Sequence, residues 1–286
     1  PENILVAAGS ESVISILCRT FFLNHEEAIT ADATFVGFFV QANVRGVSIT
    51  KIPVTDDYRF DLDAMADAIS ERTKMVYIAN PNNPTGTYVT DTEFKRFMRR
   101  VPDDVLVIMD EAYYEYAREI SDYPDSLNYD YDNVITLRTF SKAYGLAGFR
   151  VGYAIASEEI IANMMKTKLT FEPTTPAQAA ALAALGDQKF LKKTTDTVEQ
   201  GRKRLYTFFE EHDISYVPSI SNSVLMVLPD EQKSIDFTQA MLEEGVILRR
   251  TDAFGLPNCI RITVGRKKEM DHFEHSFEKV METQEY

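Results

Sequence analysis

Short runs of apolar, often β-branched residues alternate with amphipathic helical patterns along most of this chain of 286 residues. Such alternation is typical of a parallel or mixed sheet whose strands are connected by covering helices. Several runs are apolar at every position, as expected for strands that are buried on both faces. We therefore predict a three-layer α/β/α fold with a mostly parallel sheet, whose strands lie at residues 4–8, 28–31, 47–54, 74–79, 105–109, 134–137 and 150–156.

Two of the connecting helices carry sequence signals for their first turn. Thr90 is followed three residues later by Glu93, which is the pattern of a capping box. Ser157 is followed by two glutamates, and acidic residues are favoured in the first turn of a helix. We expect one helix to begin after residue 90 and another after residue 157.

A long amphipathic stretch at residues 187–212 separates this α/β part from the rest of the chain. Beyond it the sequence predicts strands at 223–228, 246–249 and 259–264, with helices at 235–244 and 267–282. These elements form a smaller α+β unit. We therefore predict a large domain at residues 1–186 and a small C-terminal domain at 187–286, with the boundary inside the long helix.

The charge and the cysteine content exclude several classes of protein. The net charge of −14, from 44 acidic and 30 basic side chains, repels nucleic-acid phosphates and anionic membranes, so we expect neither as a partner. No apolar run approaches the roughly 20 residues that span a bilayer. Cys18 and Cys259 lie far apart and form no CxxC pair, which argues against a disulfide framework or a metal site. A location in the reducing cytoplasm fits these features.

Polar residues follow two of the predicted strands at the edge where open α/β sheets place their ligands. Residues 80–86 read Asn-Pro-Asn-Asn-Pro-Thr-Gly, which is a rigid turn. Asp110 stands at the tip of a buried strand, so its carboxylate needs a cation or strong hydrogen-bond donors. A protonated heteroaromatic nitrogen is one such cation. Taken singly, an ordinary turn and a helix-capping acid remain the alternatives.

Lys142 stands among groups that suit a phosphate. The hydroxyl groups of Thr139 and Ser141 precede it, a glycine-rich stretch follows, and Arg150 comes eight residues later. A lone lysine is most often a surface charge. A desolvated lysine beside another cation, however, gives up its proton readily and becomes a nucleophile for a carbonyl group.

A glycine turn also joins the first predicted strand to the first helix, at Gly9. Ser10 and Glu11 open that helix, and the free N–H groups of a helix N-terminus attract anions. Many α/β units begin in this way, so the feature is weak alone. Together with the features above, however, it completes a set: a phosphate cradle, an amine, a buried acid and a rigid polar loop, each at a strand end.

On these motifs the chain resembles the aspartate aminotransferase superfamily of fold type I pyridoxal-phosphate enzymes, and within it is similar to the histidinol-phosphate aminotransferases. The matching segments run in the same order along nearly the whole chain: 81–86 (Pro-Asn-Asn-Pro-Thr-Gly), 110–113 (Asp-Glu-Ala-Tyr), 141–143 (Ser-Lys-Ala), 145–150 (Gly-Leu-Ala-Gly-Phe-Arg), 248–249 (Leu-Arg), 255–257 (Gly-Leu-Pro) and 261–265 (Arg-Ile-Thr-Val-Gly).

The resemblance implies that the large domain binds pyridoxal 5'-phosphate and that Lys142 is the catalytic residue, which holds the cofactor as a Schiff base. Asp110 would pair with the ring nitrogen, while Asn83 and Tyr113 would bond the ring hydroxyl group. Phe35 would stack on the ring, where the family usually has tyrosine; a core position on the face that it shares with Phe38 and Phe39 is the alternative. The phosphate-binding residues would be Ser10, Glu11, Thr139, Ser141 and Arg150.

For the substrate, the resemblance implies that Arg261 binds the α-carboxylate of glutamate in one half-reaction and the phosphate of an amino alcohol in the other. Arg249 would be a second anion contact and Asn83 a further substrate contact, whereas Arg250 has no assigned role. The implied reaction is transamination between histidinol phosphate and 2-oxoglutarate in histidine biosynthesis. Small-molecule amino donors and 2-oxo acids would be the partners.

The resemblance further implies a homodimer. Members of the family carry an N-terminal arm before the position of Pro1, and the arm supplies a tyrosine to the neighbouring subunit's cofactor. We expect this chain to lack that arm, which would affect cofactor affinity, dimer stability and turnover.

Three other functions share part of this pattern. The same fold serves aromatic aminotransferases, amino-acid-phosphate decarboxylases and carbon–sulfur lyases, which differ in their substrate contacts. A sensor domain could keep the cofactor fold without catalysis, but the basic DNA-binding segment of such a regulator is not evident. A nucleotide-binding protein ranks last, because the G-x-G-x-x-G and G-x-x-x-x-G-K-[ST] spacings are absent from the sequence.

Overall fold

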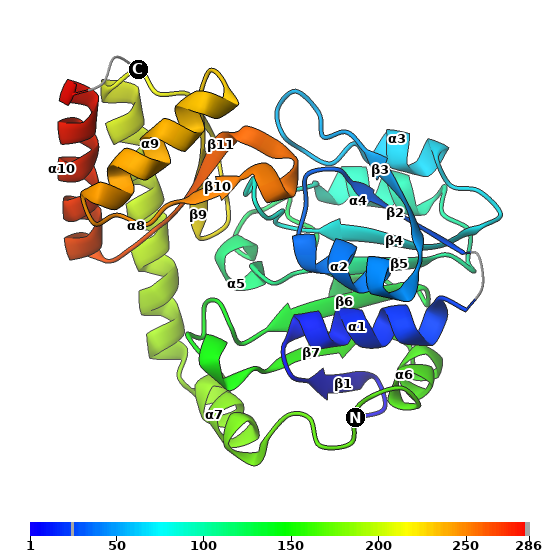
Figure 1. Cartoon of the computed structure of the whole chain (residues 1–286). Coiled ribbons are helices and arrows are strands. Elements are labelled where there is room, and N and C mark those ends of the chain that lie inside the picture. Colours follow the sequence, from blue (N-terminus) through cyan, green and yellow to red (C-terminus); the bar gives the residue numbers. More distant parts are fainter. Residues whose placement is uncertain (24–25, 284–286) are drawn as a thin grey trace.

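The computed structural model describes residues 1–23 and 26–283, and two sheets organise them (Figure 1). The larger sheet has seven strands in the order β1-β7-β6-β5-β4-β2-β3. Only β7 runs against the others, because it pairs antiparallel with both β6 and β1. The predicted mostly parallel sheet is confirmed. Its strands are β1 (Ile4–Ala7), β2 (Glu27–Ala31), β3 (Ser48–Ile52), β4 (Thr73–Ala79), β5 (Leu106–Asp110), β6 (Val134–Thr139) and β7 (Gly152–Ile155).

Helices cover both faces of this sheet and bury a separate core on each. One core lies under α1 (Ser10–Phe21), α2 (Val36–Arg45) and α6 (Glu158–Met165). The other lies under α3 (Leu62–Asp67) and α4 (Asp91–Met98). The three-layer α/β/α class is therefore confirmed. The other helical elements of this part are α5 (Tyr114–Ala117), α7 (Thr175–Gly186) and the 3₁₀ turns η1 (Ser126–Asn128) and η2 (Ala147–Phe149).

The alternation of side chains along each strand decides which residues can meet at the sheet edge. In β4, Tyr77 and Ala79 belong to the core under α1 and α2. In β5, Ile108 belongs to the same core, whereas Met109 belongs to the opposite one. Asp110, two residues after Ile108, therefore lies on the α1–α2 face of the sheet.

The second sheet is antiparallel and has the strand order β10-β11-β9-β8. Three helices pack on it around a core that includes Phe209, Phe237 and Phe277. The predicted helix at 187–212 is confirmed as α8, which extends in Figure 1 from α7, beside the larger sheet, to the second sheet. The division into two domains at residue 187 stays a prediction. The elements are α8 (Gln188–Glu211), β8 (Tyr216–Val217), β9 (Ser223–Val227), α9 (Glu231–Glu243), β10 (Arg249–Thr251), η3 (Asp252–Phe254), β11 (Leu256–Thr263) and α10 (Lys267–Thr283).

The structure corrects three details of the predicted strands. The strand expected at 246–249 begins only at Arg249, because the N–H of Val246 bonds the carbonyl of Met241, 2.8 Å away, and closes the end of α9. The two-residue strand β8 was not predicted. Arg150 was expected in a strand, but its φ of 58° is left-handed, so β7 begins at Gly152.

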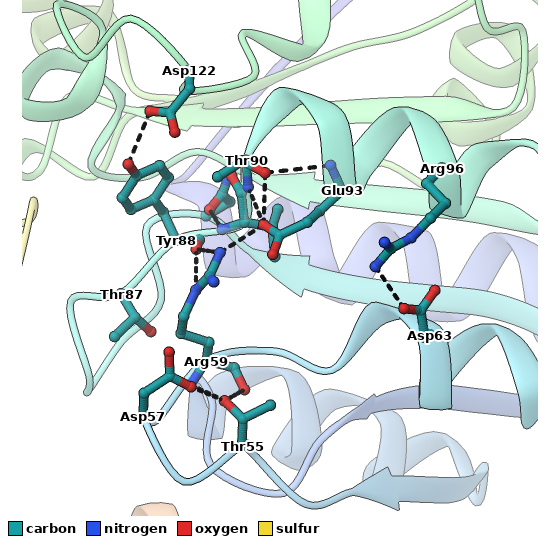
Figure 2. A network of polar contacts seen from close by, with 12 residues as sticks. Thr55, Asp57, Arg59, Asp63, Thr87, Tyr88, Thr90, Glu93, Arg96 and Asp122 are labelled. Atoms are coloured by element: carbon teal, nitrogen blue, oxygen red, sulfur yellow. Dashed lines mark hydrogen bonds and ion pairs between the residues drawn. The ribbon is translucent and has the colours of Figure 1, made fainter.

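A polar network fixes the chain that follows residues 80–86 (Figure 2). The backbone N–H of Thr90 donates to the carboxylate of Glu93 at 2.7 Å, and Glu93 N–H donates to the Thr90 hydroxyl at 3.3 Å, so the predicted capping box is confirmed. Arg59 donates to the same carboxylate at 2.6 Å and to the carbonyl of Tyr88 at 3.0 Å. Ser157 precedes α6 as predicted, although its side chain makes no capping bond.

The 24 residues of α8 are long enough to cross a bilayer, but many of them are charged. In the part of the chain that the structure describes, no helix is both long and apolar enough to do so.

Candidate active site

One cavity opens at the carboxyl edge of the larger sheet, between the ends of β4, β5 and β6 and the N-terminus of α1. All ten residues that the sequence predicts around a cofactor line it. The lining is Ser10, Glu11, Phe35, Ala79, Pro81, Asn83, Asp110, Ala112, Tyr113, Thr139, Ser141, Lys142 and Arg150.

Hydroxyl groups, backbone amides and a guanidinium group gather at one end of the cavity. Thr139 donates to the hydroxyl of Ser141 at 3.0 Å, and Arg150 approaches that hydroxyl at 3.5 Å. Gly9 precedes α1 with a φ of 91°, and a Cβ at this position would lie 2.6 Å from Nη2 of Arg150. A φ of 91° strains any residue that has a Cβ, so the turn favours glycine. No side chain caps the first turn of α1, so its N–H groups face an anion site beside Arg150.

Lys142 and Asp110 also line the cavity. The Nζ atom of Lys142 is 5.3 Å from the centroid of the Tyr113 ring. Asp110 is only 4% exposed, and its carboxylate accepts hydrogen bonds from the hydroxyl of Tyr77 at 2.6 Å and the N–H of Ala112 at 3.2 Å. Burial raises the pKa of Asp110, while these two donors and the charge of Lys142 oppose the rise. A cation beside this carboxylate would stabilise it further.

The loop at residues 80–86 is held from several sides. The buried side chain of Asn82 donates to the carbonyl of Ala33 and accepts from the hydroxyl of Thr34. Gly86 has a φ of 74°, and a Cβ there would lie 2.1 Å from Oγ of Ser219 in the chain before β9. The loop thus sits between the two sheets, with Asn83 lining the cavity.

The second sheet contributes an arginine to the same place. Arg261 in β11 donates from Nη1 to Oδ1 of Asn83 at 2.5 Å, although the two residues are 178 positions apart. Its Nε is buried and, among the described residues, has no hydrogen-bond partner. Burial lowers the pKa of Arg261. Arg249 on β10 is the strand partner of Arg261. The guanidinium carbons of both arginines lie near the Phe254 ring centroid, at 5.6 Å for Arg249 and 5.8 Å for Arg261. Neither arginine is among the residues that line the cavity.

A buried ion pair lies at the carboxyl edge of the larger sheet. Glu111 is fully buried, and its carboxylate accepts two bonds from Arg138, at 2.9 and 2.7 Å, and one from the N–H of Ser126 at 2.9 Å. Arg138 also pairs with Asp125 at 2.7 Å and lies 3.4 Å from the ring centroid of Tyr114. Burial alone lowers the pKa of Arg138, but the two acids outweigh it and leave that pKa raised. Burial raises the pKa of Glu111, while the charge of Arg138 and the N–H of Ser126 oppose the rise, and the contact joins the ends of β5 and β6.

Glu115, in α5, is a buried acid whose ionisation opposes folding. Burial raises its pKa from 4.5 to about 7. Because the folded-state value is the higher one, stability is lost as the pH rises from about 4.5 to 7. We expect Glu115→Gln to increase the free energy of unfolding by about 2–3 kcal/mol at pH 8 and by little at pH 4.5. Urea unfolding of the wild type and the variant at the two pH values measures the difference in the free energy of unfolding. An equal increase at both pH values would contradict the prediction.

The donor set of the cavity fits pyridoxal 5'-phosphate. The hydroxyl groups, the helix N-terminus and Arg150 match a phosphate. The buried carboxylate of Asp110 matches a protonated ring nitrogen, and the amine of Lys142 matches an aldehyde. Three lining residues, Ala79, Pro81 and Ala112, were not singled out from the sequence, and neither was Tyr77, which supports Asp110. The signal for Tyr77 was its spacing, because it stands two positions before Ala79 and so on the cavity face.

Comparison with known proteins agrees with this geometry. The family model described as aminotransferase class I and II matches residues 1–277. A histidinol-phosphate aminotransferase of Geobacillus sp. (strain WCH70) is 42% identical over 281 residues, which cover 98% of this chain and 76% of that protein. The enzyme of the same name from Bacillus subtilis (strain 168) is 40% identical over 269 residues, 93% of this chain and 74% of that protein.

Solved structures show the same fold. The histidinol-phosphate aminotransferase of Sinorhizobium meliloti, crystallised in complex with pyridoxal-5'-phosphate, has a TM-score of 0.90 and 28% identity, and the match covers 99% of this chain and 77% of that one. A family match of this extent, together with a cavity whose donors fit the cofactor, leads to one conclusion. The chain belongs to the class I and II aminotransferases and is a pyridoxal-phosphate-dependent aminotransferase.

Proposed function

We propose that this aminotransferase transfers the amino group between histidinol phosphate and 2-oxoglutarate, as the names of its relatives suggest. The observation that carries the proposal is Arg261, a half-buried guanidinium whose Nε has no partner among the described residues. A buried N–H donor of this kind needs a hydrogen-bond acceptor, and an anion is the acceptor that forms the strongest bonds with a guanidinium group. A planar guanidinium fits both a carboxylate and a phosphate, so one residue can serve the two substrates in turn. Arg249 is the second cation on the paired strand.

Residues from the ends of five strands, β1, β2, β4, β5 and β6, hold the cofactor in this proposal. Ser10 and Glu11 bind its phosphate through their backbone N–H groups, and the side chains of Thr139, Ser141 and Arg150 bind it as well. Asn83 and Tyr113 bond the ring hydroxyl, Phe35 stacks on the ring, and Asp110 pairs with the ring nitrogen. When bound, the cofactor supplies an electron sink for the bond that breaks at the substrate's α-carbon. These roles follow the lining of the cavity and the partners of Asp110 described above.

Lys142 has two tasks in the proposed reaction. Its Nζ atom would anchor the cofactor before the substrate arrives, and the freed amine would then carry a proton between the substrate's α-carbon and the cofactor. Lys142 lies near the ring of Tyr113, and both residues line the cavity. Asn83 orients Arg261, since the two side chains are hydrogen-bonded. We further propose that residues 1–186 form the cofactor-binding domain and that residues 187–286 form the domain that contributes Arg249 and Arg261.

A substrate panel tests the proposed function. Purified holoenzyme is mixed with histidinol phosphate, phenylalanine, tyrosine or histidinol, each with 2-oxoglutarate, and glutamate formation is measured. We expect histidinol phosphate to give the highest kcat/KM, and histidinol, which lacks the phosphate, to be much poorer. A higher kcat/KM for an aromatic amino acid would overturn the proposed substrate and favour an aromatic aminotransferase.

The anion contact of Arg261 has its own test. Arg261→Gln removes the charge, so we expect kcat/KM for both histidinol phosphate and glutamate to fall roughly 10- to 100-fold, because a charge-assisted hydrogen bond contributes about 1.5–3 kcal/mol. Arg266→Gln is the matched control, since the side chain of Arg266 is 85% exposed. Steady-state kinetics with each substrate varied measures both. A fall for only one substrate would contradict the dual role.

We propose that the chain works as a homodimer that pairs through α7 and the segment before it. α7 is rich in alanine and leucine, yet only Ala177 and Ala181 are buried. Leu182 is 74% exposed and Phe171 is 91% exposed, and such a concentration of apolar surface marks an interface. We expect Leu182→Glu to shift the protein from dimer to monomer in sedimentation equilibrium. Ile247→Glu, at a residue that is 86% exposed near β10, should leave the dimer unchanged.

A further inference from the structure

Tyr77 is a buried tyrosine whose hydroxyl group reaches Asp110 from the neighbouring strand. It is 0% exposed, and its hydroxyl donates to Oδ2 of Asp110 at 2.6 Å. Its ring stacks on Phe38 of α2, with the centroids 4.3 Å apart and the planes 8° from parallel. A ring held between a helix and a sheet in this way cannot swing away from its partner. The hydroxyl therefore has one fixed acceptor.

The strand register explains why the contact forms. In the parallel pair of β4 and β5, Ala79 is the partner of Asp110 and Tyr77 is the partner of Ile108. Tyr77 thus lies two residues back from the carboxylate on the same face of the sheet. That diagonal is within reach of a long aromatic side chain and beyond the reach of most others.

We propose that Tyr77 is a positioning residue for transamination. Its hydroxyl holds the side chain of Asp110 in one orientation and in its ionised form, so that the carboxylate keeps the ring nitrogen of the cofactor protonated. The inference rests on the proposed pairing of Asp110 with that nitrogen, and it adds the group on which the pairing depends.

The surroundings of Asp110 support this role. Burial raises the pKa of Asp110, and the hydrogen bond from Tyr77 is the largest influence that opposes the rise. Burial also raises the pKa of Tyr77 well above its ordinary range, so its hydroxyl remains a donor. The other groups that act on the carboxylate are the N–H of Ala112, 3.2 Å from Oδ1, and the charge of Lys142 after β6. Neither of these donates a hydrogen bond to Oδ2.

The test is Tyr77→Phe, which removes one oxygen atom and keeps the stack on Phe38. The holoenzyme is reconstituted with cofactor that carries ¹⁵N in its ring, and the ¹⁵N chemical shift is followed with pH. In the wild type we expect a protonated ring nitrogen at neutral pH. In Tyr77→Phe we expect the midpoint of this protonation to fall by about one pH unit or more, a tenfold or greater loss of proton affinity. The shift reports cofactor bound to folded protein, so a modest loss of stability does not enter the measurement.

Tyr129→Phe is the matched control, because the hydroxyl of Tyr129 also donates to a carboxylate, that of Asp91, away from the cavity lining. It should titrate as the wild type does; an equal shift in this variant would overturn the inference. If Tyr77→Phe titrates as the wild type does, Tyr77 has no positioning role, and the proposed function stands. If the wild-type ring nitrogen is itself unprotonated at neutral pH, the pairing with Asp110 fails, and the role of Tyr77 fails with it.

Discussion

Lys142→Ala is expected to lower turnover with histidinol phosphate and 2-oxoglutarate by at least about 10⁴-fold, because both the covalent anchor and the proton carrier are lost. The folded protein should still bind the cofactor through the residues around the phosphate and Asp110. Added cofactor should no longer give the visible absorbance band of a lysine-linked aldehyde. Stopped assays for glutamate and absorbance spectra measure the two effects.

Lys166→Ala is the control for this experiment, because Lys166 is an exposed lysine in the turn that ends α6. It should keep the turnover and the absorbance band of the wild type. Retention of the band or of substantial turnover in Lys142→Ala would show that another residue anchors the cofactor.

Arg138→Met is expected to destabilise the protein by about 3–5 kcal/mol, because it leaves the carboxylate of Glu111 buried and without its cation. Replacing Glu111 as well removes the unpaired buried charge, so it should restore much of the lost free energy of unfolding. We therefore expect the double variant Arg138→Met, Glu111→Leu to be more stable than Arg138→Met alone. Urea unfolding of the cofactor-free protein measures all three free energies.

The matched control is Lys203→Met, which breaks the ion pair of Lys203 with Glu199 on α8. Both side chains are more than half exposed, at 71% and 55%. An exposed pair of this kind contributes less than about 0.5 kcal/mol. An equal loss in Arg138→Met and Lys203→Met would contradict the importance of the buried pair.

The sequence predicted the parts of the fold and the site that depend on local patterns. Strand β5 and most of β4 are buried on both faces, so they read as nearly continuous apolar runs, and the residues directly after such runs are expected at the sheet edge. Asp110 is predicted in this way, whereas Lys142 is predicted from the groups around it that suit a phosphate, Thr139, Ser141 and Arg150. The start of the helix after Thr90 could also be predicted from a local pattern, because the capping bonds join residues three positions apart.

The parts that were missed or wrongly bounded depend on contacts between distant segments or on single backbone angles. The hydrogen bond from Tyr77 to Asp110 depends on the register of β4 against β5, and local sequence patterns do not predict that register. The contact of Arg261 with Asn83 requires the docking of one sheet on the other. The left-handed backbone angle of Arg150, whose guanidinium group lies beside Gly9, cannot be predicted from strand propensity.

The placement of the two proposed substrate-binding arginines on a separate sheet has a consequence for how the substrate specificity of such a fold can change. Arg249 and Arg261 stand on strands that have their own apolar core under α8, α9 and α10. Substitutions on these strands can change which substrate is bound, while Lys142, Asp110 and the residues proposed to bind the phosphate keep their positions. Substrate specificity can therefore change during evolution without changes in the cofactor-binding residues, provided that the loop at residues 80–86 continues to contact both sheets.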